Sequence, residues 1–116
     1  MSNYKLSIVA AVYNLEKYLP RCLDALVNQT LQEIEILCVD DGSTDSAPQI
    51  IDEYAKKYPN KVKAFHKPNG GEFTTRNYGL ERATGEYVTF VDTDDYVEKT
   101  WAEKLYNVAK ENDADM

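Results

Sequence analysis

Long apolar runs are missing from this 116-residue sequence. No stretch approaches the roughly 18 apolar residues that a membrane-spanning helix needs, and residues 1–5 (MSNYK) lack the charged-then-apolar layout of a secretory signal. Internal repeats, low-complexity tracts and linkers are absent as well. Because 43% of the residues are hydrophobic and 28% are charged, the composition is that of a globular protein. The sequence predicts one domain over residues 1–116.

Cysteine and histidine are scarce, with two cysteines and one histidine. Cys22 and Cys38 stand in separate apolar stretches and form no Cys-x-x-Cys pair, which favours buried, reduced thiols over a disulfide. This indicates a cytoplasmic location, at the cytoplasmic face of a membrane for a longer protein. His66 has no second histidine or cysteine at metal-ligand spacing, so we expect it to be structural.

Basic residues are few, 13 against 20 acidic residues, and the formal net charge is −7. Such a chain repels phosphate backbones, which excludes nucleic acid as the main partner. A small phosphate-bearing ligand stays compatible with this charge if a cation lies between the ligand and the protein.

Four short segments predict β-strands, at residues 6–12, 34–39, 62–66 and 87–91. The first, second and fourth are nearly continuous apolar runs, which is typical of strands buried on both faces of a parallel sheet. Apolar residues at three- and four-residue spacing predict helices between and after the strands, around residues 19–27, 50–55 and 74–83 and from Thr100 onward.

This alternation predicts an α/β fold, with a doubly wound, mostly parallel sheet, right-handed crossovers and flanking helices. Ligands of such sheets bind beyond the carboxyl ends of the strands. The loops that follow Val12, Val39, His66 and Val91 are therefore the places to look for function.

The loop after the second strand is acidic and reads DDGSTD at residues 40–45. A well-capped turn accounts for residues 42–45, because glycine permits a sharp turn and the residues after it can cap a helix. It does not account for two adjacent carboxylates at the end of an apolar strand. We therefore expect Asp40, Asp41 or both to be functional.

The loop after the fourth strand carries Asp92, Asp94 and Asp95. Two carboxylates about 5 Å apart repel each other by roughly 3 kcal/mol at an effective dielectric constant near 20, so the cluster favours binding of a hard cation such as Mg²⁺ or Mn²⁺. A solvated acidic turn is the alternative. A calcium loop of the EF-hand type is excluded, because Tyr96 and Val97 stand where an oxygen ligand and an obligatory glycine belong.

The loop after the third strand (KPNGGE, residues 67–72) predicts a flexible turn that leads into a helix. Arg76 would lie in the first turn of that helix, where the helix dipole disfavours a cation. An anionic partner would offset this, and the sequence leaves two candidates open, a diphosphate or one of the aspartate clusters. No Gly-Lys-Ser/Thr follows the glycines, so the loop is not a Walker loop.

Taken together, five segments resemble the donor-binding half of family 2 glycosyltransferases, which have the GT-A fold. The resemblance extends over nearly the whole chain, and the matching segments come in the family's order: residues 7–14 (SIVAAVYN), 39–45 (VDDGSTD), 69–71 (NGG), 76–79 (RNYG) and 85–95 (GEYVTFVDTDD). The resemblance implies transfer of a sugar, with inversion, from a nucleotide-diphosphate sugar, most often UDP-linked. The acceptor would be a hydroxyl group of a carbohydrate or of a lipid-linked sugar, as in polysaccharide biosynthesis.

The same resemblance assigns roles to individual residues of the nucleotide site. Tyr13 would stack on the base, with the backbone of Ala11 beside it. Asp41 would accept a hydrogen bond from the base N–H, and Asp40 would support the turn. Arg76 is counted with these nucleotide-binding residues.

A metal site follows from the resemblance as well, because Asp92 and Asp94 form the family's DXD pair. Asp94 would bind Mn²⁺ or Mg²⁺, and Asp92 would face the ribose or a metal-bound water. The ion would neutralise the diphosphate and stabilise the charge that grows on the leaving group.

Two departures from the family pattern matter. Ala11 stands where the family commonly has proline, which should loosen that loop without abolishing binding. The chain ends at Met116, whereas family members continue into an acceptor-binding half that holds the catalytic base. We therefore expect a donor-binding domain that is truncated before that half, and we assign no base.

Two other classes of protein compete with this interpretation. A signalling receiver domain has a similar length and architecture, but it needs an acid pair after the first strand, where this chain has residues 11–14 (AVYN). A non-catalytic nucleotide-sugar-binding module or accessory subunit would keep the fold without the reaction, and the intact acidic motifs argue against it.

Overall fold

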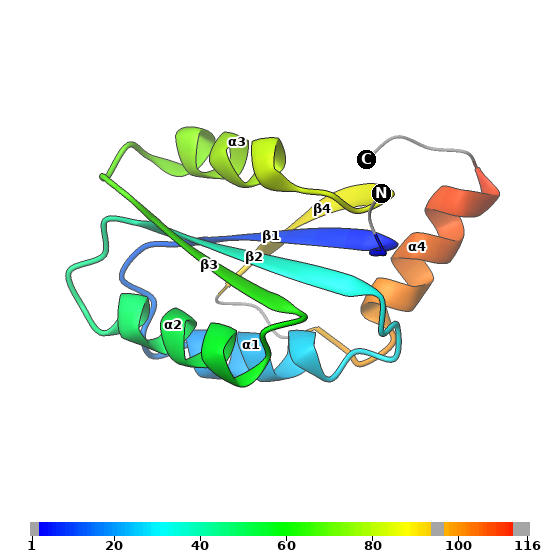
Figure 1. Cartoon of the computed structure of the whole chain (residues 1–116), viewed down its shortest axis with the longest axis horizontal. Helices are drawn as coiled ribbons and strands as arrows, with labels where there is room; N and C mark the ends of the chain where they lie inside the picture. Colours follow the sequence, from blue (N-terminus) through cyan, green and yellow to red (C-terminus); the bar gives the residue numbers. More distant parts are fainter. Residues whose placement is uncertain (1–2, 94–96, 113–116) are drawn as a thin grey trace.

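A computed structural model describes residues 3–93 and 97–112 of the chain. Strands and helices alternate along it, which confirms the predicted βαβαβαβα order (Figure 1). The elements are β1 Leu6–Val12, α1 Leu19–Val27, β2 Ile34–Asp41, α2 Ala47–Lys57, β3 Val62–Lys67, α3 Glu72–Arg82, β4 Tyr87–Asp92 and α4 Trp101–Glu111.

The four strands form one sheet in the order β3-β2-β1-β4, and every neighbouring pair is parallel. The chain moves outward from β1 to β2 and β3 and then returns to place β4 on the other side of β1. Helices α1 and α2 cover one face of the sheet and α3 covers the other (Figure 1), which confirms the doubly wound fold. The strand order reverses between β1 and β4, the place where such sheets open a crevice at the carboxyl ends of their strands.

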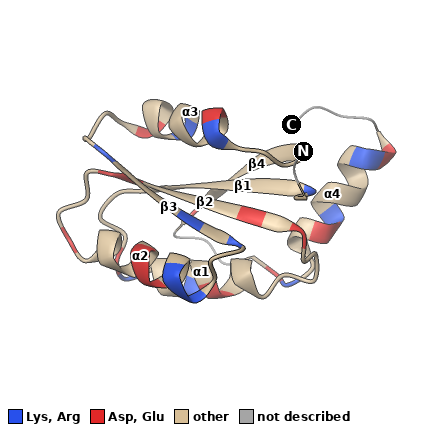
Figure 2. Cartoon of the chain, viewed as in Figure 1, with Lys and Arg blue, Asp and Glu red and all other residues tan. Residues whose placement is uncertain are grey.

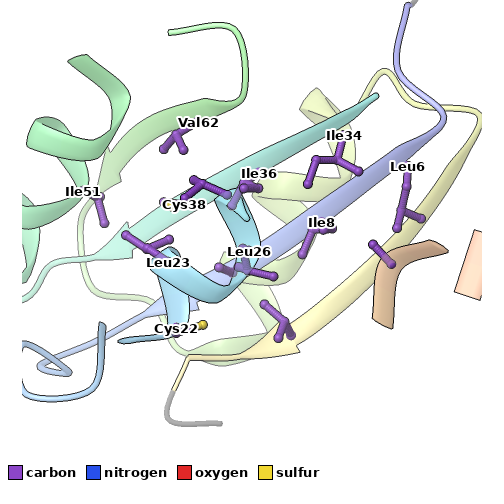
Figure 3. Close-up of a cluster of buried hydrophobic side chains, with 14 of the residues drawn as sticks. Leu6, Ile8, Cys22, Leu23, Leu26, Ile34, Ile36, Cys38, Ile51 and Val62 are labelled. Atoms are coloured by element: carbon purple, nitrogen blue, oxygen red, sulfur yellow. The ribbon is translucent and has the colours of Figure 1, made fainter. Parts of the chain in front are cut away.

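The main apolar core lies between the sheet and helices α1, α2 and α4. Leu6, Ile8, Leu23 and Leu26 are completely buried in it (Figure 3). These residues come from the continuous apolar runs and the helical stripe of the sequence, so burial explains both patterns. Because one face of the sheet is packed against this core, the strands hold the loops at their ends in place.

Helix α3 approaches the opposite face of the sheet closely at Gly79. A β-carbon at this position would clash with the side chain of Val9 in β1. The absence of a side chain at Gly79 therefore permits the close approach of α3 to β1.

Glu35 is a completely buried carboxylate on the α3 side of β2. Its Oε2 accepts hydrogen bonds from the Ser7 hydroxyl (2.6 Å) and the Thr84 amide (2.6 Å). Its Oε1 accepts one from the Lys63 ammonium (2.6 Å). Burial raises the pKa of Glu35, but these donors outweigh burial and hold the pKa below its ordinary value. The carboxylate thus ties three strands and the chain segment before β4 together.

Both cysteines are buried and neither forms a disulfide, as the sequence predicts. Burial raises the pKa of the Cys38 thiol, with a further increase from Cys22 nearby. Within the described part of the chain, no helix is long and apolar enough to cross a membrane. Acidic and basic residues both occur on α2 and on α4 (Figure 2), so the net charge of −7 is not gathered on one helix.

Candidate nucleotide site

A cavity of about 430 Å³ lies at the carboxyl ends of β1 and β4. Its walls come from the ends of three strands, from the loop after β3 and from the first turns of α3. It brings together five of the residues that the sequence singles out: Ala11, Tyr13, Asp41, Arg76 and Asp92. The cavity thus lies where the strand-end rule directs attention, and what it binds is a separate question. Asp94 lies outside the described residues.

The corner after β1 presents an aromatic ring. Tyr13 is 48% exposed, so its ring is available for contact with a ligand. The next residue, Asn14, has a φ of 52°, a left-handed conformation that asparagine tolerates better than most residues. Two hydrogen bonds hold this corner against the turn after β2, from the Asn14 amide to Ser43 Oγ (3.0 Å) and from the Thr44 amide to Asn14 Oδ1 (2.8 Å).

Asp41 anchors the loop after β3. Its Oδ1 accepts hydrogen bonds from Lys67 Nζ and the Gly70 amide, both at 2.8 Å, and its Oδ2 accepts one from the Gly71 amide at 3.0 Å. Burial raises the pKa of Asp41, but Lys67 and the two amides outweigh it and hold the pKa below its ordinary value. The carboxylate is ionised at neutral pH and accepts hydrogen bonds only.

Asn69 completes the surroundings of Asp41 with a longer hydrogen bond, 3.3 Å from its Nδ2 to Oδ2. A carboxylate has about four lone-pair positions, and all four directions are now in use. A base N–H that bonds to Asp41 must share or displace one of these donors. The bond from Asn69 is the longest of them and therefore the easiest to displace.

Asp40 does not line the cavity. Its Oδ1 accepts the Ser43 amide (2.9 Å) and its Oδ2 lies 3.0 Å from Nδ1 of His66. Gly42 in the same turn has a φ of 72°, and a β-carbon there would lie 2.8 Å from the Asn69 amide nitrogen. The turn therefore requires glycine both for its positive φ and for the close approach of Asn69. Asp40 is connected to the cavity only indirectly, through its hydrogen bond to this turn.

Arg76 and Asp92 face each other across the cavity wall. Arg76 Nη2 lies 3.6 Å from Asp92 Oδ1 and 2.7 Å from Glu72 Oε1, and its guanidinium lies over the Phe90 ring with 5.5 Å to the centroid. The sequence leaves a diphosphate or an aspartate cluster as the partner of Arg76. In this structure an aspartate, Asp92, is one partner, and a diphosphate stays a prediction.

The residues around Asp92 bear on the expected metal. The Asp92 side chain is 62% exposed and lines the cavity. Among residues 3–93 and 97–112, no three or more His, Cys, Asp or Glu side chains lie close enough together to hold a metal ion. Mg²⁺ in nucleotide sites binds through one or two carboxylates plus phosphate and water. One exposed carboxylate in the cavity wall fits that arrangement, which nucleotide oxygens would complete.

Sequence reasoning missed the side chains that hold Asp41, because it treats residues 67–72 as a flexible turn. Lys67 and Asn69 are both bonded to this carboxylate. The available signal was a cation at the end of one strand and an anion at the end of another. That signal has meaning only once β3 is known to lie beside β2, with Asp41 opposite Lys67 in the register.

Comparison with known proteins points to one family. Residues 7–116 match the sequence model of glycosyl transferase family 2. The chain is 47% identical over 115 residues to a poly(ribitol-phosphate) β-glucosyltransferase of Bacillus spizizenii, covering 97% of the chain and 18% of that protein. It is 43% identical over 112 residues to the glycosyltransferase GlyG of Streptococcus pneumoniae, covering 96% of the chain and 37% of GlyG. The chain thus spans well under half of the relatives it matches.

Solved structures show the same fold. TarS of S. aureus, in a complex with UDP-GlcNAc, superposes with a TM-score of 0.79 at 38% identity, covering 92% of the chain and 31% of TarS. The mannosyltransferase PcManGT of Pyrobaculum calidifontis, in a complex with GDP-Man and Mn²⁺, also gives a TM-score of 0.79, at 24% identity, covering 91% of the chain and 31% of PcManGT. The second similarity concerns the fold alone.

Proposed function

The chain belongs to glycosyl transferase family 2, and we propose that it forms the part of a glycosyltransferase that binds the nucleotide-sugar donor. The enzyme would transfer a sugar from a nucleotide-diphosphate sugar, UDP-linked by preference, to a hydroxyl group of a carbohydrate or a lipid-linked sugar, with inversion at the anomeric carbon. The family match speaks against a receiver domain. A non-catalytic binding module stays the alternative, and a transfer assay on a longer protein distinguishes the two.

One observation carries the proposal. A single cavity combines an exposed aromatic ring, a buried ionised carboxylate, a guanidinium and an exposed carboxylate, from Tyr13, Asp41, Arg76 and Asp92. These are the groups that a base, its N–H, a diphosphate and a cation require. TarS, which shares 38% identity with this chain, has been solved with UDP-GlcNAc, and this supports a uridine nucleotide as the ligand.

The proposed assignment follows the positions of these groups in the cavity. The base stacks on Tyr13 beside the backbone of Ala11, and its N–H donates to Asp41 in place of Asn69. Asp40 keeps the turn in place from outside the cavity. Arg76 faces the diphosphate, and the pairing of Arg76 with Asp92 at 3.6 Å is long enough to open when phosphate arrives.

A divalent cation, Mn²⁺ or Mg²⁺, is part of the proposal, with Asp94 as its ligand and Asp92 towards a metal-bound water or the ribose. When bound, such an ion neutralises the diphosphate oxygens and stabilises the leaving group. It also resolves the conflict between an anionic ligand and a chain of net charge −7.

We assign no catalytic base to residues of this chain. The chain spans well under half of its relatives, so we expect the chain by itself to bind nucleotide weakly, with a dissociation constant of about 1 mM, and to turn over slowly or not at all. Isothermal titration with UDP and Mn²⁺ tests the binding. Glu111→Gln, an exposed change at the end of α4, is the control variant. Absence of heat at millimolar UDP in both proteins would contradict the proposed site.

A further inference from the structure

His66 lies between two carboxylates from different elements. Its Nδ1 is 3.0 Å from Asp40 Oδ2 at the end of β2, and its Nε2 is 2.8 Å from Asp52 Oδ1 on α2. The Asp40 side chain is only 6% exposed, whereas that of Asp52 is 59% exposed. The imidazole therefore connects a buried acid at the strand ends to a surface helix.

The chemistry of the three groups selects one protonation state. Ionised carboxylates only accept hydrogen bonds, and only the imidazolium form of histidine donates from both ring nitrogens. The Asp40 carboxylate raises the pKa of His66 above its ordinary value, burial opposes this, and Asp52 adds to the increase. Asp40 from β2 and Asp52 from α2 are the carboxylates that raise this pKa, while the next residue, Lys67, is engaged by Asp41.

A series of hydrogen bonds leads from this bridge to the cavity. Asp40 accepts the Ser43 amide at 2.9 Å through its other oxygen. The Ser43 hydroxyl in turn accepts the Asn14 amide at 3.0 Å. Asn14 holds a left-handed conformation directly after Tyr13, whose ring lines the cavity. A change at His66 is thus three contacts away from the corner that carries the ring.

We propose that His66 is a positioning residue for nucleotide binding. By bridging Asp40 and Asp52, it holds the turn at residues 40–45 and, through Ser43, the corner that presents Tyr13 to the cavity. This inference rests on the proposed function for its effect on affinity. The bridge itself is a property of the fold and is measurable without nucleotide.

The position of His66 leads to a pH dependence that a merely structural histidine would not give. When the ring loses its proton, it donates to only one of the two carboxylates. Either the turn loses its donor or the ring loses its attachment to α2. Nucleotide affinity should therefore be constant below the pKa of His66 and fall by about fivefold as the pH rises through it, the effect of about one hydrogen bond.

The test is titration of UDP between pH 5.5 and pH 9 into the wild-type chain and three variants. His66→Gln should bind about fivefold more weakly at pH 6 and show no such transition. Asp52→Asn leaves the cavity intact and should move the transition to lower pH, because it removes one of the charges that raise the pKa of His66. Glu53→Gln, an exposed neighbour on α2, should behave as the wild type. Ratios between proteins at one pH cancel the titration of UDP itself.

Amide hydrogen exchange provides the readout that is independent of nucleotide. At a fixed pH, the Asn14 amide should exchange several-fold faster in His66→Gln than in the wild type, while the Leu37 amide in the core strand β2 stays unchanged. Equal exchange at Asn14 in both proteins, or a wild-type affinity that follows the same pH profile as Asp52→Asn, would overturn the inference. Failure of the wild type to bind UDP at all would instead contradict the proposed function. The exchange rate of the Asn14 amide would still show whether His66 is coupled to the corner after β1.

Discussion

The ammonium group of Lys67 lies 2.8 Å from the carboxylate of Asp41, and both side chains are largely buried. This pair joins the end of β2 to the end of β3, opposite each other in the register. It keeps the loop that follows β3 against the cavity.

Replacing Lys67 by methionine should destabilise the domain by about 3 kcal/mol, because Asp41 would keep a buried charge without its cation. Urea unfolding at pH 7 measures the change. The control is Lys5→Met, whose partner Glu33 is 3.6 Å away and whose side chain is 45% exposed. This control should cost less than about 1 kcal/mol, and similar losses in both variants would contradict the special position of Lys67.

Replacing Glu35 by glutamine should cost about 2 kcal/mol at pH 7, because the amide NH₂ would face one of the donors that now point at the carboxylate. The pKa of Glu35 is lowered in the folded state. Its contribution is therefore complete above the pKa of an unfolded glutamate and is lost as the pH falls through the folded pKa. The difference between the two proteins should accordingly shrink as the pH falls below the ordinary pKa of a glutamate, about 4.5.

Urea unfolding at several pH values measures this difference. Glu33→Gln is the matched control, since the Glu33 side chain is 46% exposed, and it should change the stability by less than about 0.5 kcal/mol. A difference between wild type and Glu35→Gln that grows towards acid pH would have the wrong sign for this explanation.

Gly79→Ala tests the close approach of α3 to the sheet. Alanine favours the helix by about 1 kcal/mol over glycine, whereas the clash with Val9 costs about 1 to 3 kcal/mol. The net result should be a loss of about 1 kcal/mol in thermal or urea unfolding. Val9→Ala in the same chain removes the clashing methyl groups, so the cost of Gly79→Ala should vanish in the double variant. The same cost in both backgrounds would exclude the contact as its cause.

Tyr13→Ala should weaken UDP binding about tenfold, since a stacked aromatic ring contributes about 1.5 kcal/mol beyond its buried area. Tyr13→Phe keeps the ring and should bind as the wild type in isothermal titration. Tyr18→Ala is the control for general surface effects, because Tyr18 is also about half exposed and does not line the cavity. If Tyr18→Ala also weakened UDP binding, the loss in Tyr13→Ala could not be attributed to stacking of its ring.

Asp94→Asn should abolish the dependence of UDP binding on Mn²⁺ and leave the affinity without metal nearly unchanged, because an amide is a much poorer ligand for a hard cation. Titrations with and without Mn²⁺ measure both quantities. Asp95→Asn is the neighbouring control and should retain the response to Mn²⁺. Equal responses of the wild type and Asp94→Asn would make the ligand assignment wrong.

The fold was largely predictable from the sequence. Buried parallel strands appear as continuous apolar runs, and amphipathic helices appear as apolar residues at three- and four-residue spacing. Element ends were less predictable. Strand β2 runs two residues beyond Val39 to Asp41, since pairing with β3 continues there despite the low strand propensity of aspartate. Helix α3 begins at Glu72 rather than at Thr74, directly after Gly71 with its φ of 94°.

The location of the cavity was predictable from the rule on strand ends, and the contacts among its residues were not. Asp41 binds Lys67, and Asp40 binds His66, only because β3 is the neighbour of β2. The order of elements along a chain does not determine the order of strands in a sheet. The sequence therefore indicated which residues gather, but not which of them hold one another.

The position of β4 beside β1 in the sheet also determines at which stage of folding the cavity can form. Thr93 donates a hydrogen bond to the Ala11 carbonyl across 82 positions of sequence, so the two walls of the cavity come from segments far apart in the sequence. During synthesis, β1 to α3 emerge and can pack while one wall is still missing. A nascent chain therefore acquires this cavity only when β4 docks beside β1, and a ligand that binds the cavity would favour the docked state over earlier intermediates.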